Sequence, residues 1–381
     1  MSRAIHISAS LLLTLLNLVT ALAFSAPPMP FPRPLHPGGF SLPPMVEDLI
    51  PIATAASSAT ATDDGTRSRE MLRTDLLVVR PPDVESLWEW YAYTKRQTDA
   101  DPSWGRIWPT ALSLARFTLQ CLDCGDGSDA GHEMHFASEL GRAEQTLVVE
   151  AIKALRTTSH IVELGCGLGV AGLAFAASAS AAKAIDTSRS VTFLDRDPYA
   201  LHCVMASACV NKLATAPIAT SPTSLSSEHG NSTALSITVR SSMDDWTNTD
   251  KNIHYNDLHL DALACENDQT LILASDILYE PSSMESLATK LRNLLHPSHG
   301  GFVLITEPER ERTPGCRSAF AQSLRDIGGR LTTVPLTQLE NNGVPTKQSV
   351  LVESDVDMDG CLAKTVLIVV HFDGTNIGKQ R

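Results

Sequence analysis

The sequence reads Glu163-Leu164-Gly165-Cys166-Gly167-Leu168-Gly169 directly after the apolar residues Ile161 and Val162. A short apolar run that ends in glycines is typical of a buried strand followed by a turn. Small apolar residues continue from 172 to 182, as expected of a helix that packs on a sheet. Glycine lets the backbone approach a ligand closely, and the first N–H groups of a helix can bind an anionic group. The stretch therefore predicts a strand, a ligand-binding loop and a helix.

Apolar segments on both sides of this unit alternate with helical ones. Helices are expected at residues 198–213, which open with a proline in the first turn, and at 282–295. Further strands are expected at 191–194, 271–274, 302–305 and 365–371. Strands that alternate with helices indicate a parallel, doubly wound α/β sheet, Rossmann-like, with helices on both faces. Three polar segments are expected to be insertions: 121–141, 215–234 and 338–361.

The glycine loop also fits a dinucleotide fingerprint if it is parsed as Gly167-x-Gly169-x-x-Gly172. Three features favour a methyl donor over a nicotinamide cofactor. Glu163, two residues before the first glycine, is placed to meet the ammonium of a methionine moiety. Asp195 ends the next strand and is suited to pair with ribose hydroxyls. A second polar site, at Asp276, ends a later strand.

The loop and the acid after it resemble the class I, seven-strand S-adenosylmethionine-dependent methyltransferases. The resemblance covers about residues 86–371 and implies the seven-strand methyltransferase sheet of that family. It also implies S-adenosyl-L-methionine as the cofactor. The loop residues expected to bind it are Gly165, Cys166, Gly167 and Gly169.

Three more segments are similar to the small protein-lysine methyltransferases, which include the electron-transfer-flavoprotein beta-subunit enzyme and chaperone-modifying enzymes. Trp108, in a tryptophan–proline pattern before the sheet, matches a ring that packs against the cofactor. Asp244-Asp245-Trp246 matches an acid–tryptophan pair of the adenine pocket, with Trp246 for stacking and either aspartate, chiefly Asp245, for the adenine amino group. A core tryptophan and a surface turn are the plain alternatives for these two segments.

The third segment is Ser275-Asp276-Ile277-Leu278-Tyr279, which matches an Asp-x-x-Tyr motif at the end of the fourth strand, facing the transferred methyl. Ser275 is expected on the cofactor side. Asp276 is the candidate that orients an incoming lysine amine and relays its proton, and Tyr279 the candidate wall of the channel. The plain alternative is that Asp276 only ends a strand. Glu307-Pro308-Glu309-Arg310 resembles an Asp-Pro-x-Arg run that the flavoprotein-modifying branch carries after strand five.

The implied function is methyl transfer to a lysine side chain of a protein substrate. Fold does not fix the acceptor. A small-molecule N- or O-methyltransferase and a non-catalytic cofactor-binding scaffold therefore stay open.

The N-terminus predicts targeting. Arg3, an apolar segment and the small-residue ending Ala21-Leu22-Ala23 indicate a signal peptide at residues 1–23. Phe24 after the cut resembles the bipartite presequence of algae with secondary plastids, which implies a plastid location; secretion is the alternative. Residues 24–75 are expected to be a transit segment and disordered linker, and 76–381 the methyltransferase domain. No membrane span is expected after processing.

Composition excludes other classes. The net charge of −13 disfavours nucleic acid as the main partner, because phosphate binding needs a basic face. Eight cysteines are too few for a disulfide scaffold of this length. Cys121-x-x-Cys124 has no second ligand pair of zinc-site spacing, so no metal is expected.

Overall fold

The computed structural model describes residues 45–61, 67–98, 100–123, 140–158, 160–181, 189–215, 237–247, 270–336 and 364–374. These lie in one compact unit, Ser41–Arg381. The expected signal peptide, the first part of the transit segment and Cys124 fall outside the described residues. So do most of the three expected insertions.

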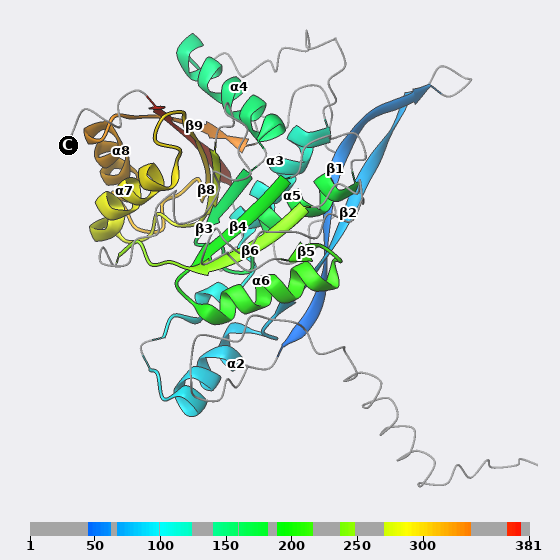
Figure 1. The fold of residues 1–381 in the computed structure, drawn as a ribbon, viewed down its shortest axis with the longest axis vertical. Helices are drawn as coiled ribbons and strands as arrows, with labels where there is room; N and C mark the ends of the chain where they lie inside the picture. The colour runs from blue at the N-terminus through cyan, green and yellow to red at the C-terminus, as the bar shows by residue number, and fades with distance from the viewer. Residues whose placement is uncertain are drawn as a thin grey trace, which may run out of the picture. The chain divides into compact units, whose positions relative to one another are not determined.

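One mixed sheet forms the centre of this unit (Figure 1). Its strand order is β5-β6-β4-β3-β7-β8-β10-β9, and β5 is only two residues long, so seven longer strands build it. The strands are β3 (His160–Leu164), β4 (Arg189–Asp195), β5 (Ala214–Thr215), β6 (Ile237–Met243), β7 (Thr270–Ser275), β8 (Gly300–Pro308), β9 (Gly329–Pro335) and β10 (Thr365–Asp373). The predicted Rossmann-like α/β class is confirmed.

The parallel part of the sheet runs from β5 to β8. β10 departs from the expected parallel arrangement, because it pairs antiparallel with both β8 and β9. The crossover from β8 through α8 (Cys316–Asp326) places β9 two strand positions from β8, and β10 then fills the position between them in the opposite direction. The sheet is therefore mixed rather than purely parallel.

Helices cover both faces of the sheet, as predicted (Figure 1). α7 (Met284–Leu294) and α8 pack on one face and share an apolar core with β7, β8 and β10. The other face carries α3 (Pro109–Asp123), α4 (Arg142–Thr157), α5 (Val170–Ala181) and α6 (Pro198–Val210). Asp197 caps α6 by accepting the Tyr199 N–H at 2.8 Å, and Pro198 follows it at the first helical position.

An antiparallel strand pair, β1 (Val46–Ala61) and β2 (Arg67–Arg80), precedes the sheet. It lies largely where the composition predicts a linker. Leu76 and Val78 are both buried, and because alternate residues of a strand share a face, this is the face of β2 that packs inward. Its backbone is tied to α6, since the Ser207 hydroxyl accepts the Val79 N–H at 2.8 Å and the Asn211 side chain bonds both backbone groups of Leu77. The apolar pattern in the sequence of β2 is too short to be told apart from the polar sequence around it.

No helix in the part of the chain that the structure describes is both long and apolar enough to span a membrane.

Candidate functional site

A pocket opens where β3, β4 and β7 end, at the carboxyl edge of the parallel strands. In open α/β sheets this edge is where ligands bind. The pocket is lined by Asp101, Ser103, Trp104, Arg106, Ile107, Trp108, Ala111, Gly165, Cys166, Gly167, Leu168, Gly169, Val170, Asp195, Arg196, Asp197, Trp246, Ser275, Asp276, Ile277 and Tyr279. Ten of the twelve residues that the sequence singled out lie on this lining; Glu163 and Asp245 do not.

The glycine loop forms the floor of this pocket between β3 and α5. Gly165, Gly167 and Gly169 have φ angles of 60°, 50° and 67°, in the left-handed region that favours glycine. A Cβ on Gly169 would lie 2.8 Å from both Phe193 and Val204, so the close packing of the loop also requires glycine there. Sequence and backbone geometry therefore agree on where the chain bends.

Asp195, the last residue of β4, holds this loop. Its Oδ2 accepts the Gly167 N–H at 2.8 Å, and its Oδ1 accepts the Asp197 N–H at 2.9 Å. Burial raises the pKa of the Asp195 carboxyl to about 6, against the two backbone N–H donors, which lower it. Asp195 therefore both positions the loop and lines the pocket.

Glu163 lies elsewhere than its sequence position suggested. Its side chain is buried beneath the pocket and accepts the Gly172 N–H at 2.7 Å, in the first turn of α5. Burial raises the pKa of Glu163 to about 8. The side chain thus stabilises the start of α5 and does not present a charge to the pocket.

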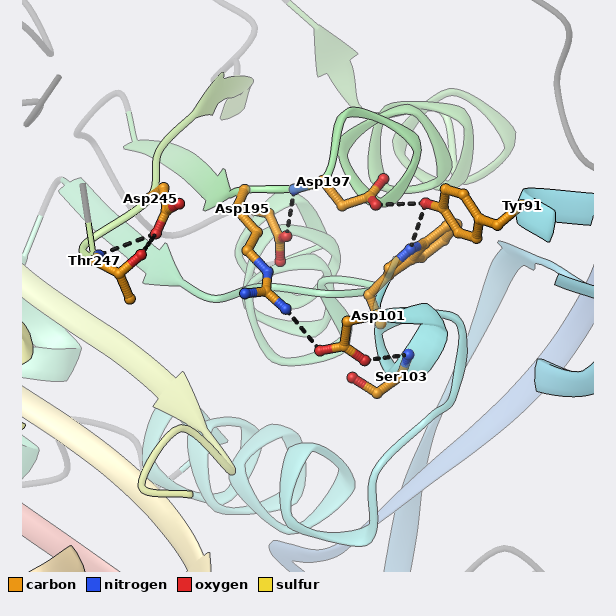
Figure 2. Close-up of polar contacts among 9 residues, drawn as sticks. Tyr91, Asp101, Ser103, Asp195, Asp197, Asp245 and Thr247 are labelled. Atoms are coloured by element: carbon orange, nitrogen blue, oxygen red, sulfur yellow. Dashed lines mark hydrogen bonds and ion pairs between the residues drawn. The ribbon is translucent and has the colours of Figure 1, made fainter. Parts of the chain in front are cut away.

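The two aspartates in the segment after β6 make different contacts. Trp246 is buried and walls the pocket, and its ring lies 3.2 Å from where a Cβ of Gly165 would be. Asp244 forms a buried ion pair with Lys290 of α7 at 2.8 Å, and its N–H bonds the Asp195 carbonyl at 2.8 Å. Asp245 bonds the N–H and hydroxyl of Thr247 in a turn (Figure 2). Asp244 therefore anchors the segment that carries Trp246.

Asp276 follows β7 with a φ of 56°, which is strained for a residue other than glycine. Its N–H bonds the Thr306 carbonyl at 2.9 Å, and its Oδ1 accepts the Arg312 Nε–H at 2.6 Å. Burial raises the pKa of Asp276, and the charge and hydrogen bond of Arg312 oppose this. The backbone and Arg312 together fix this carboxylate at the pocket.

Glu307 holds the next two residues of the same turn. Its Oε1 accepts the N–H groups of Ile277 at 2.8 Å and Leu278 at 3.0 Å. The side chain is 3% exposed, and burial raises its pKa to about 8. The sequence resemblance marked this position, and the structure gives it the task of fixing the Asp276 turn.

Trp108 lines the pocket together with Asp276, and two guanidinium groups lie near its ring. The Cζ of Arg312 lies 4.1 Å and that of Arg106 5.0 Å from the ring centroid. Such distances fit cation–π contacts. Tyr279 also lines the pocket, with its residue 38% exposed, and burial raises its pKa.

The opposite rim is a polar network that the sequence did not reveal (Figure 2). The Tyr91 hydroxyl donates to Asp197 and accepts the Trp104 Nε1–H at 3.1 Å. Arg196 pairs with Asp101 at 2.7 Å. The one sequence signal was Asp197 before Pro198, a helix-cap pattern. Nothing in the sequence marked Tyr91 or Arg312, because their partners are far away along the chain.

Among the described residues, no group of three or more His, Cys, Asp and Glu side chains is arranged to hold a metal ion.

The sequence matches no protein-family model and no curated protein sequence. Several solved structures share features of the fold at low similarity. A S-adenosylmethionine-dependent methyltransferase from Clostridium acetobutylicum is 9% identical, with 62% of this chain and 94% of that chain covered and a TM-score of 0.34. A TehB-like SAM-dependent methyltransferase from Corynebacterium glutamicum is 14% identical over 60% and 87% of the two chains, with a TM-score of 0.31. A putative methyltransferase from Bacillus halodurans is 12% identical over 61% and 99%, with a TM-score of 0.30. Similarities at this level carry no argument about activity or substrate.

The raised pKa of Glu307 makes a pH-dependent contribution to stability. A carboxyl with a pKa of about 8 when folded and 4.5 as its ordinary value binds its proton more tightly in the folded state. The free energy of unfolding should therefore fall as pH rises from about 4.5 to 8. Glu307→Gln keeps an acceptor for the two N–H groups and cannot ionise, so urea unfolding at several pH values should show a shallower fall than in the wild type. Glu163 titrates over the same range, so some slope should remain. An unchanged slope would contradict the assignment.

Proposed function

We propose that this protein is an S-adenosyl-L-methionine-dependent methyltransferase that acts on a lysine side chain of a protein substrate. The observation that carries the proposal is the attachment of the glycine loop to Asp195 at the pocket, between the Trp246 wall and Asp276. A bare glycine turn would not require a buried carboxylate, whose desolvation is unfavourable, at the end of the neighbouring strand.

The residues present fit the donor. Gly165 has no Cβ, so the Trp246 ring comes close to the loop and leaves a flat apolar wall suited to an adenine ring. Asp195 has a carboxylate at the pocket, and carboxylates at this position of α/β folds pair with ribose hydroxyls. Ser275 and the Gly165–Gly169 backbone complete this side of the pocket. Glu163 lies outside the pocket lining and bonds the Gly172 N–H, so its expected contact with the donor's ammonium carries none of this proposal.

When bound, S-adenosyl-L-methionine supplies a methyl group on a sulfonium, which passes to a nucleophile that attacks in line. The protein's task is to hold that nucleophile in its neutral form and in the right direction. A lysine amine has an ordinary pKa of about 10.4, and a buried channel lowers it because burial disfavours the charged form. Asp276 is placed to orient the amine and accept its proton, with the Tyr279 ring as the channel wall.

Arg312 prepares Asp276 for this task. Burial alone favours the protonated carboxyl, which cannot accept a proton from the amine. The Arg312 guanidinium stabilises the ionised form and leaves the second carboxylate oxygen, Oδ2, for the acceptor, because its Nε–H binds Oδ1. A lysine acceptor agrees with this arrangement, since its amine offers hydrogens to Oδ2.

The donor site can be tested by binding alone. Asp195→Ala removes a charged hydrogen-bond partner, a loss of about 1.5–3 kcal/mol, so the affinity for S-adenosylhomocysteine in calorimetry should fall by about ten- to a hundredfold. Asp326→Ala is the matched control: it removes an exposed acid at the end of α8, outside the pocket lining, and should leave the affinity unchanged. Equal losses in the two variants would contradict the assignment of Asp195.

The acceptor site is tested by separating binding from chemistry. Asp276→Asn keeps the volume and removes the charge, so S-adenosylhomocysteine should bind with near-normal affinity. Single-turnover transfer of tritiated methyl groups to lysate protein should fall by about 10²–10⁴, the range for loss of a group that moves a proton at the reacting centre. Asp326→Asn, at the exposed end of α8, is the control for a general effect of charge. If S-adenosylhomocysteine binding collapses in Asp276→Asn, the residue belongs to the donor side.

A further inference from the structure

The charged residues on the pocket lining differ in whether their side chains have a polar partner. Asp195 and Asp197 bind backbone N–H groups, Asp101 pairs with Arg196, and Asp276 pairs with Arg312. Arg106 alone among the charged lining residues has no hydrogen bond or ion pair from its side chain to any residue that the structure describes.

The position of Arg106 is nonetheless fixed. Its backbone N–H bonds the Ser103 carbonyl at 3.2 Å, and its guanidinium lies over the Trp108 ring at 5.0 Å. The Arg312 guanidinium lies over the same Trp108 ring at 4.1 Å and bonds Asp276, so Arg106 lies at the Asp276 end of the pocket. The side chain is half-buried, and its N–H donors therefore gain from a partner that enters the pocket.

The charges around Arg106 select the partner. Four aspartates and two arginines line the pocket, which makes the lining net negative and disfavours a doubly charged ligand group. A guanidinium presents its N–H groups as a planar fork that matches a carboxylate in two parallel hydrogen bonds. A single carboxylate is the group that fits.

We propose that Arg106 binds the carboxylate at the amino-acid end of the methyl donor; this rests on the proposed function. The donor's sulfur carries the methyl, the amino-acid chain and the adenosyl group. With the adenine against Trp246 and the methyl facing Asp276, the amino-acid chain is assigned to the part of the pocket where Arg106 lies. Other partners for that carboxylate are few. The Gly167 N–H already donates to Asp195, and Arg196, the second arginine of the lining, is paired with Asp101.

Two ligands that differ at this end test the proposal. S-adenosylhomocysteine carries the carboxylate, whereas 5′-methylthioadenosine has the same adenosine and sulfur without it. Calorimetric titrations of the full chain would compare wild type, Arg106→Gln and Arg106→Lys. Arg330→Gln, which removes an exposed arginine paired with Asp373 on β9 and β10, is the matched control.

In Arg106→Gln, the affinity for S-adenosylhomocysteine should fall by about ten- to a hundredfold, as for loss of a charged hydrogen bond. The affinity for 5′-methylthioadenosine should stay within about twofold by the same reasoning, and Arg106→Lys should recover part of the loss because it keeps the charge. Equal losses for both ligands would overturn the proposal, since Arg106 would then act through Trp108. So would unchanged affinity for both. If the wild type binds neither ligand, the proposed function itself fails.

Discussion

The pairing of the Asp195 carboxylate with the Gly167 N–H is the contact on which the rest of the site depends. It joins the end of β4 to the loop after β3, and its other oxygen fixes the Asp197 N–H at the start of α6. The Asp195 carbonyl in turn accepts the Asp244 N–H, which places the segment carrying Trp246. One residue at a strand end therefore sets the positions of three neighbouring loops. Because its carboxylate is buried, this contact is strong only while the loop supplies its N–H donors.

The second half of the site follows a similar plan at the end of β7. Asp276 is held in a strained backbone conformation by its N–H bond to the Thr306 carbonyl and by Glu307, whose carboxylate accepts the N–H groups of the next two residues. Arg312 then pairs with the carboxylate and packs on Trp108. Both pocket walls are thus supported from behind by buried polar groups, which keeps the facing groups in place without blocking them.

Much of this was predictable from the sequence where the signal is local. The glycine spacing, the acid ending the second strand and the Asp-x-x-Tyr segment all lie at strand ends, and the order of strands and helices brings them to one edge. Glu163 shows the limit of such reasoning. The sequence places it next to the loop, but the direction of its side chain depends on strand alternation, which turns it toward α5.

Long-range partners were not predictable. Arg312 reaches Asp276 across 36 positions, and Tyr91 reaches Asp197 across 106. No periodicity or motif encodes such pairs, because they depend on packing of the whole sheet. The same holds for β10, whose apolar run predicted a strand but could not give its direction.

The proposed function requires a pocket that takes a methyl donor rather than a dinucleotide, although the loop also fits a dinucleotide fingerprint. Calorimetric titration of the wild-type chain with S-adenosylhomocysteine and, separately, with NADH compares the two directly. A methyl-donor pocket should show saturable binding of S-adenosylhomocysteine and no measurable binding of NADH. Binding of NADH, with none of S-adenosylhomocysteine, would contradict it.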